Sequence, residues 1–173
     1  MIIWINGTFG VGKTETAKIL HKRIPNSYLY DPEEVGFLIR KQLPVELCEE
    51  DFQDHEEWRM WNYHLLKKVT TKTEKVVIVP MTLTNEQYYQ EIIGRLKKEG
   101  IQLHHFTLVA EPLTIIDRLK KRGDEDNKFI VNRIEKNVKQ LDANFFQRHI
   151  NTEKLTAEET ASEVLNIIIS KCL

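Results

Sequence analysis

The sequence has little of what marks a secreted or membrane protein. Its two cysteines, Cys48 and Cys172, match no metal-binding spacing, which favours free thiols in a reducing cytoplasm. No apolar run approaches the roughly 20 residues that span a bilayer. The apolar start at Ile2–Ile5 lacks the basic flank of a signal peptide. We expect a cytoplasmic protein without an integral membrane segment.

An excess of charge of one sign is also lacking. The chain has 25 Lys and Arg against 26 Asp and Glu, for a formal net charge of -1. This balance gives no bulk attraction for nucleic acid or an anionic membrane. No Asn-Lys-x-Asp stretch that would read guanine is present, which disfavours a GTPase switch. We expect no nucleic-acid partner, and the oligomeric state stays open.

What is present is typical of a globular α/β domain. The length of 173 residues suits one domain, residues 1–173. Segments rich in Ile and Val alternate with segments of helical period, a pattern typical of a parallel sheet covered by helices on both faces. Strands are expected at about 2–6, 27–30, 76–79, 102–109 and 147–150. Helices are expected at 13–24, within 33–73 with a break at Pro44, from a Thr84–Gln87 capping box to Gly100, from Pro112 to Gly123, at about 130–141, and after a Thr156–Glu159 capping box.

A phosphate-binding motif follows the first strand directly. The residues Gly7-Thr8-Phe9-Gly10-Val11-Gly12-Lys13-Thr14 satisfy GxxxxGK[ST]. Glycines let successive N–H groups turn around a phosphate at a helix start, and Lys13 adds a positive charge for the distal phosphates. The Thr14 hydroxyl is the expected Mg²⁺ ligand. This context, between an apolar strand and an amphipathic helix, argues against a chance glycine turn and predicts a site for ATP or GTP with Mg²⁺.

One acidic residue stands at a strand end on the expected ligand side. Asp31 follows the second strand, where ligands of open parallel sheets gather, and it is a candidate base or acceptor-orienting group. It also suits the N-cap of the next helix, and the two roles are compatible. The third strand ends in Pro80-Met81-Thr82 without the acid that often holds Mg²⁺ through water, so Asp31 is also a candidate for that role. We include Thr82 among the candidate substrate contacts.

Arginines bracket the polar segment 124–128. Arg118 and Arg122 share a helix face, and Arg133 follows, so 118–133 is a candidate lid that neutralises charge on a transferred phosphoryl group. The alternative is a solvated helix face. Arg118 and Thr152 are further candidates for nucleotide contact, although Thr152 also suits a simple turn.

The helical segment 33–73 is the candidate acceptor side. Arg40, Arg59 and Trp58 lie in it and would frame an acceptor with polar and apolar parts. The aromatic residues also suit an ordinary core.

With these residues in hand, the chain resembles the bacterial tunicamycin-resistance ATP-binding proteins, within the wider group of nucleoside monophosphate kinase-like P-loop proteins. The stretches IIWINGTFGVGKTETA, YLYDPEEVGF, DFQDHEEWRMWNY, VVIVPMTLTNEQYYQEIIGRL and HHFTLVAE carry the likeness over nearly the whole chain. The resemblance implies a P-loop fold with a five-stranded parallel core, ATP as nucleotide and a link to resistance against a lipid-linked nucleoside antibiotic.

Two functions remain open from the sequence. The first is a kinase that transfers the γ-phosphate of ATP to a hydroxyl of a small-molecule acceptor, for which the acid and the arginines are suited. The second is an ATP-gated protein that sequesters a toxic ligand without modifying it, which needs the loop and a pocket but no base.

Overall fold

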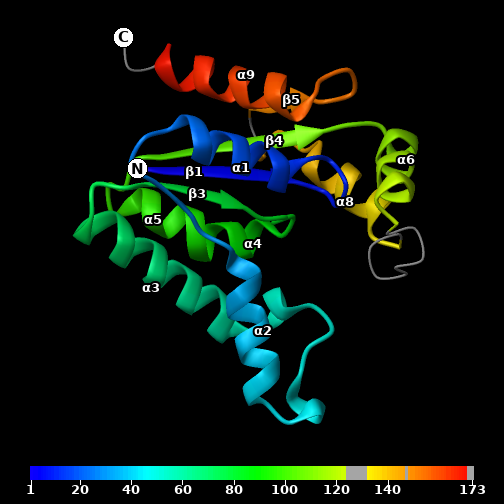
Figure 1. The fold of residues 1–173 in the computed structure, drawn as a ribbon. Coiled ribbons are helices and arrows are strands. Elements are labelled where there is room, and N and C mark those ends of the chain that lie inside the picture. Colours follow the sequence, from blue (N-terminus) through cyan, green and yellow to red (C-terminus); the bar gives the residue numbers. More distant parts are fainter. Residues whose placement is uncertain (124–131, 147, 171–173) are drawn as a thin grey trace.

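The computed structural model describes residues 1–123, 132–146 and 148–170, which form one parallel sheet with helices on both faces (Figure 1). The strand order is β2-β3-β1-β4-β5, with every neighbouring pair parallel. This arrangement confirms the predicted α/β class and the five-stranded core. The strands are β1 (Ile2–Gly7), β2 (Ser27–Leu29), β3 (Val76–Pro80), β4 (Leu103–Val109) and β5 (His149–Asn151).

The sheet is buried on both faces because a helical layer covers each one. Helices α1 and α9 cover one face, and α3, α4 and α5 cover the other (Figure 1). Side chains alternate along β1, so Trp4 joins one apolar cluster and Ile3 joins the opposite one. Both are completely buried, as expected for the central strand of a parallel sheet. In the part of the chain that the structure describes, the helices of eight or more residues are α1 (Lys13–Arg23), α2 (Pro32–Gln42), α3 (Glu56–Lys72), α6 (Pro112–Arg122), α8 (Ile134–Leu141) and α9 (Ala157–Ile169).

The predicted break at Pro44 is longer than one residue. Two 3₁₀ turns, η1 (Val45–Leu47) and η2 (Phe52–Asp54), separate α2 from α3. The second turn is fixed by Asp51, whose carboxylate accepts a hydrogen bond from the Gln53 N–H at 3.0 Å. The Phe52 ring packs against Gly36 of α2, where an added Cβ would lie only 2.5 Å from the ring's Cγ. The segment between α2 and α3 is therefore ordered and packs against α2.

The prediction of a capping box at Thr84 and Gln87 is wrong. The cap of α4 (Glu86–Tyr89) is Asn85, whose Oδ1 accepts from the N–H groups of Gln87 and Tyr88 at 2.8 and 3.2 Å. Asparagine is as good an N-cap as threonine, and its place one residue later leaves the Thr84 side chain out of the cap. The helix continues through a π-helical turn, η3 (Gln90–Gly94), into α5 (Arg95–Lys98).

Two other helix-end predictions are confirmed. Thr156 and Glu159 form the reciprocal capping box of α9. Helix α6 begins at Pro112, and Gly123, which has a left-handed backbone, is the C-cap that follows its last residue, Arg122. The last strand lies slightly later than predicted, and the expected lid loop 124–128 and Cys172 fall outside the described residues. Within the described ranges, no helix has the length and apolar character needed to cross a membrane.

Candidate functional site

The GxxxxGK[ST] motif forms a loop from the end of β1 to the start of α1. Gly12 caps the helix with a left-handed φ of 106°, which a residue with a side chain rarely adopts. A Cβ placed there would meet nothing within 4 Å, so the backbone conformation and not crowding requires this glycine. Thr14 lies exposed in the first turn of α1, where the helix N-terminus favours anions.

Lys13 points back over this loop. Its Nζ donates to the Thr8 carbonyl at 2.9 Å and lies 5.7 Å from the centre of the Phe9 ring. Burial lowers the pKa of Lys13 to about 8; the positive charge of Arg122 adds to this lowering, whereas Glu33 opposes it. Lys13 is thus influenced by the charges of Arg122 and Glu33, although the three residues belong to three different helices.

The loop is held from behind by a residue that the motif does not include. Asn6 is completely buried, and its Oδ1 accepts from the N–H groups of Gly7 and Leu83, both at 2.8 Å. Its Nδ2 donates to the Leu83 carbonyl at 2.8 Å. The Thr82 hydroxyl also donates to the Gly7 carbonyl at 2.7 Å. Hydrogen bonds of Asn6 and Thr82 therefore join the start of the phosphate loop to the segment after β3.

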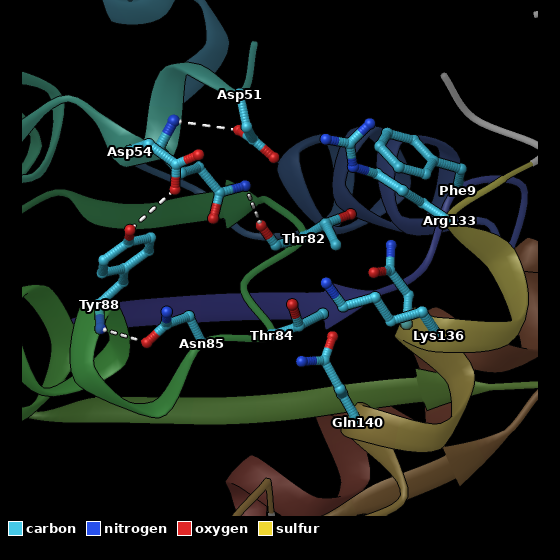
Figure 2. Close-up of a pocket in the computed structure, with 12 residues that line it drawn as sticks. Phe9, Asp51, Asp54, Thr82, Thr84, Asn85, Tyr88, Arg133, Lys136 and Gln140 are labelled. Atoms are coloured by element: carbon cyan, nitrogen blue, oxygen red, sulfur yellow. Dashed lines mark hydrogen bonds between the residues drawn. The ribbon is translucent and has the colours of Figure 1, made fainter. Parts of the chain in front are cut away.

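Two adjoining pockets open beside the loop. The larger, of about 440 Å³, has aromatic side chains and Met81 in its wall. The smaller, of about 170 Å³, is mainly polar and is the one drawn in Figure 2. They share Phe9, Asp51, Gln53 and Thr82, so one ligand can extend through both. The larger pocket is lined by Phe9, Glu33, Phe37, Arg40, Glu50, Asp51, Phe52, Gln53, Met81 and Thr82. The smaller is lined by Phe9, Asp51, Gln53, Asp54, Thr82, Thr84, Asn85, Tyr88, Arg133, Lys136, Asn137 and Gln140.

The acid after β2 that faces the site is Glu33 rather than Asp31. Asp31 is exposed and caps α2, because its Oδ1 accepts from the Glu33 N–H at 2.9 Å. Glu33 is half-buried and lines the larger pocket. Its pKa is raised by burial and by the negative charge of Asp31, against the opposing effect of Lys13. The sequence analysis missed Glu33, although a helical start at Pro32 turns adjacent carboxylates in different directions.

Arg118 joins the phosphate loop to the segment that follows β5. Its guanidinium donates to the Thr152 carbonyl at 2.6 Å and to the Thr152 hydroxyl at 3.1 Å, and it reaches the Val11 carbonyl at 3.4 Å. The structure thus brings together two residues predicted to contact the nucleotide and ties both to the phosphate loop. For Arg118 these contacts contradict the alternative prediction of a solvated helix face.

The remaining predicted arginines divide between the site and the scaffold. Arg133 lines the smaller pocket and forms an ion pair with Glu50 at 3.3 Å. Arg40 lines the larger pocket and donates to the Glu50 carbonyl at 2.5 Å. Arg59 instead pairs with Glu91 and donates to the Gln53 carbonyl at 2.6 Å, which fixes the wall segment in place.

Trp58 belongs to the core. It is completely buried, and its indole N–H donates to the Pro32 carbonyl at 2.9 Å. Trp58 lines neither of the two pockets. The structure therefore supports the alternative that the sequence had left open, in which Trp58 is a core residue and does not contact an acceptor.

The metal ligands offered by the chain are few. Thr14 supplies an exposed hydroxyl beside the loop, and β3 ends in Pro80 followed by Met81 and Thr82, without a carboxylate. Among the described residues no group of three or more His, Cys, Asp or Glu side chains is placed to hold a metal ion. The site fits an ion that is held mainly by nucleotide phosphates, as is usual for Mg²⁺.

The fold and the loop define a nucleotide-binding P-loop protein. The family described as AAA domain matches residues 3–141, and the chain belongs to it. It also belongs with the tunicamycin-resistance proteins: the structure of that protein from Deinococcus radiodurans is 34% identical, with a TM-score of 0.82, over 96% of this chain and 94% of the other. The resemblance drawn from the sequence is therefore confirmed.

More distant structures share the fold. A gluconokinase from Sinorhizobium meliloti matches with a TM-score of 0.68 and 14% identity, over 95% of this chain and 89% of that one. Shikimate kinase from Acinetobacter baumannii, solved with shikimate, matches with a TM-score of 0.60 and 16% identity, over 99% and 94% of the two chains. Comparison with curated proteins found no match.

Proposed function

We propose that this chain is an ATP- and Mg²⁺-dependent phosphotransferase that transfers the γ-phosphate of ATP to a hydroxyl group of a small molecule. The observation that supports this most is that Glu33, which lines the larger pocket, is near enough to Lys13 of the phosphate loop for the charge of each to act on the pKa of the other. A cation for the distal phosphates and a half-buried carboxylate with a raised pKa are what such a transfer requires. The relative from Deinococcus suggests a nucleoside-type antibiotic as the acceptor.

In this proposal the backbone N–H groups of residues 7–14 and the Lys13 ammonium hold the phosphates. Mg²⁺ would be held by the Thr14 hydroxyl and would neutralise phosphate charge. The acceptor hydroxyl oxygen forms a bond to the γ-phosphorus as the bond from that phosphorus to the bridging oxygen of ADP breaks. Glu33 accepts the hydroxyl proton, and Arg122 and Arg133 neutralise charge on the transferred group. Arg118 and Thr152 contact the base side of the nucleotide.

The pockets support an acceptor with two parts. The larger pocket, with Phe37, Phe52 and Met81, would take an apolar part, and Arg40 would border it. The smaller pocket would take a polar part beside Thr82. Both lie next to Phe9 in the phosphate loop, so a hydroxyl at their junction is near the site of the distal phosphates.

One observation favours a second function, ATP-gated sequestration without transfer. Asp31 is engaged as a helix cap, and no acid ends β3, so the two positions where the sequence led us to look for a base or a metal-holding acid do not supply one. Sequestration needs only the nucleotide site and the pockets.

The two functions are separated by mass spectrometry of tunicamycin, uridine and amino-sugar acceptors after incubation with protein, Mg²⁺ and ATP. A product heavier by one phosphoryl group, formed by the wild type and absent for Lys13→Ala, supports transfer. Unmodified tunicamycin that stays bound to the protein in the presence of ATP supports sequestration and would contradict the proposed kinase.

A further inference from the structure

The smaller pocket contains a hydrogen-bonding group that the protein itself leaves unsatisfied. Three buried side-chain oxygens in the described part of the chain have no partner, namely Oγ1 of Thr8, Oγ1 of Thr107 and Oε1 of Gln140. Of these, only Gln140 lines a pocket beside the phosphate loop. Leaving a buried acceptor unpaired is unfavourable, so a ligand that donates a hydrogen bond to it is favoured.

The surroundings of Gln140 form a recognition surface rather than a chance gap. Gln140 and Lys136 extend from α8, and Thr84 faces them from the segment after β3 (Figure 2). Figure 2 shows these three side chains pointing toward one another across the pocket. Thr84 takes no part in capping α4, since Asn85 has that role. Two elements far apart in the sequence therefore present polar groups to one small space.

The charges around the pocket cancel. Asp51 and Asp54 stand on one side, and Arg133 and Lys136 stand on the other. An anionic ligand group would meet the two carboxylates, and a cationic one would meet the two basic groups. A neutral group avoids both repulsions, and like-charge contacts of this kind are an effective means of excluding wrong ligands.

We propose that the smaller pocket binds a neutral, polar head group of the acceptor and that Gln140 Oε1 accepts a hydrogen bond from an N–H or O–H of that group. This inference rests on the proposed function, since it names the chemical class that the same site takes. In this proposal Gln140 is a specificity-determining residue. The polar head group lies in the smaller pocket and the apolar part of the acceptor lies in the larger one. A volume of about 170 Å³ suits one sugar or nucleobase ring rather than a whole disaccharide.

The test is a ligand-observed NMR titration with protein saturated by Mg²⁺ and a non-hydrolysable ATP analogue. The probes differ mainly in charge: N-acetylglucosamine is neutral, glucosamine is cationic and glucuronate is anionic, and uridine is compared with uridine monophosphate. We expect at least one neutral probe to bind the wild type and its charged counterparts to bind at least tenfold more weakly. Equal affinities for neutral and charged probes, or binding by none, would overturn the proposal.

The variants separate recognition from structural damage. Gln140→Met should weaken the neutral probe by about three- to tenfold, the usual effect of one lost hydrogen bond. Lys139→Met, on the same helix but exposed and outside this pocket, should leave it unchanged. Gln140→Glu should shift preference toward glucosamine, a change that a purely structural role does not produce. Unchanged binding by Gln140→Met, or no shift in preference with Gln140→Glu, contradicts the assignment.

The outcome is independent of whether phosphoryl transfer occurs. Because the ATP analogue cannot react, a sequestering protein and a kinase give the same binding result. A failed transfer assay with selective binding of neutral probes would therefore remove the kinase and leave the head-group assignment. Phosphoryl transfer to an acceptor, together with equal binding of neutral and charged probes, would keep the kinase and remove the head-group assignment.

Discussion

At the residue scale, the most informative group is the Lys13 ammonium. It is half-buried beside the Phe9 ring, and burial lowers its pKa to about 8. A bound phosphate reverses this effect because it favours the charged form. The affinity for ATP is therefore linked to the protonation of a single side chain.

This linkage predicts how the affinity for ATP depends on pH. Below pH 8 the free protein already carries the proton, so affinity stays nearly constant. Above pH 8 binding must take up a proton, and the dissociation constant should rise by up to about tenfold per pH unit. Calorimetric titration between pH 7 and 9.5 measures this. Lys13→Arg is the control, since it keeps its charge throughout and should bind independently of pH; the same slope in both proteins would exclude Lys13 as its source.

A second prediction concerns the two acids after β2. Asp31→Asn keeps a good N-cap and should retain nearly normal stability and turnover. Glu33→Gln removes the carboxylate that faces the pocket and should lower phosphoryl transfer by about 10²-fold or more, the scale of a general base, with ATP affinity changed much less. Steady-state kinetics and melting temperatures measure the two effects. A large loss with Asp31→Asn and none with Glu33→Gln would return the base to Asp31.

At the scale of elements, the wall of the larger pocket depends on how closely η2 approaches α2. The Phe52 ring fills the space that a side chain at position 36 would need, and Arg40 lies over the same ring, 5.5 Å from its centre. Arg59 then holds the Gln53 carbonyl from α3. The shape of the acceptor side is thus set by contacts between elements that no single element encodes.

Gly36→Ala tests this packing. The added methyl group must displace Phe52 near its Cβ and Cγ, which are not free to move, so we expect a loss of about 1–3 kcal/mol in the free energy of unfolding. Binding of tunicamycin should weaken as well. Gly94→Ala is the matched control: the nearest atoms to its methyl group belong to the flexible Gln90 side chain, and the change should be neutral or stabilising by up to about 1 kcal/mol. Urea denaturation compares them, and equal losses would show that the approach of Phe52 is unimportant.

At the scale of the whole molecule, both apolar clusters contain residues of the central strands β1 and β3, so we expect residues 1–173 to unfold as one domain. The phosphate loop joins β1 to α1, and Asn6 and Thr82 tie it to the segment after β3. Nucleotide binding therefore acts on the centre of the fold rather than on a separate lobe.

This predicts a single thermal transition that ATP shifts upward. At 100 times its dissociation constant, Mg²⁺-ATP should stabilise the fold by about 2.7 kcal/mol. For a domain of this size that is about 5–11 °C. Calorimetry should show the shift for the wild type and a much smaller one for Lys13→Ala, whereas AMP should act similarly on both proteins. Two separate transitions would contradict the single domain.

The sequence by itself determined the fold class, the order of the elements and the phosphate loop. These follow from local patterns: the unbroken apolar run at Val76–Val79, the glycines before Lys13, and the end signals at Pro112 and Gly123. Such signals are short in range, because periodicity, backbone freedom and capping act within a few residues.

Only the tertiary structure decided which side chains meet. The choice of Glu33 over Asp31 depends on the direction in which α2 leaves β2, and the core position of Trp58 depends on how α3 packs against α2. Asn6 and Gln140 belong to no recognised motif. Asn6 is identified by its hydrogen bond with Leu83, which is distant in sequence, and Gln140 by a buried side-chain oxygen that has no partner. Contacts between distant segments are fixed by packing, and packing is a property of the folded chain.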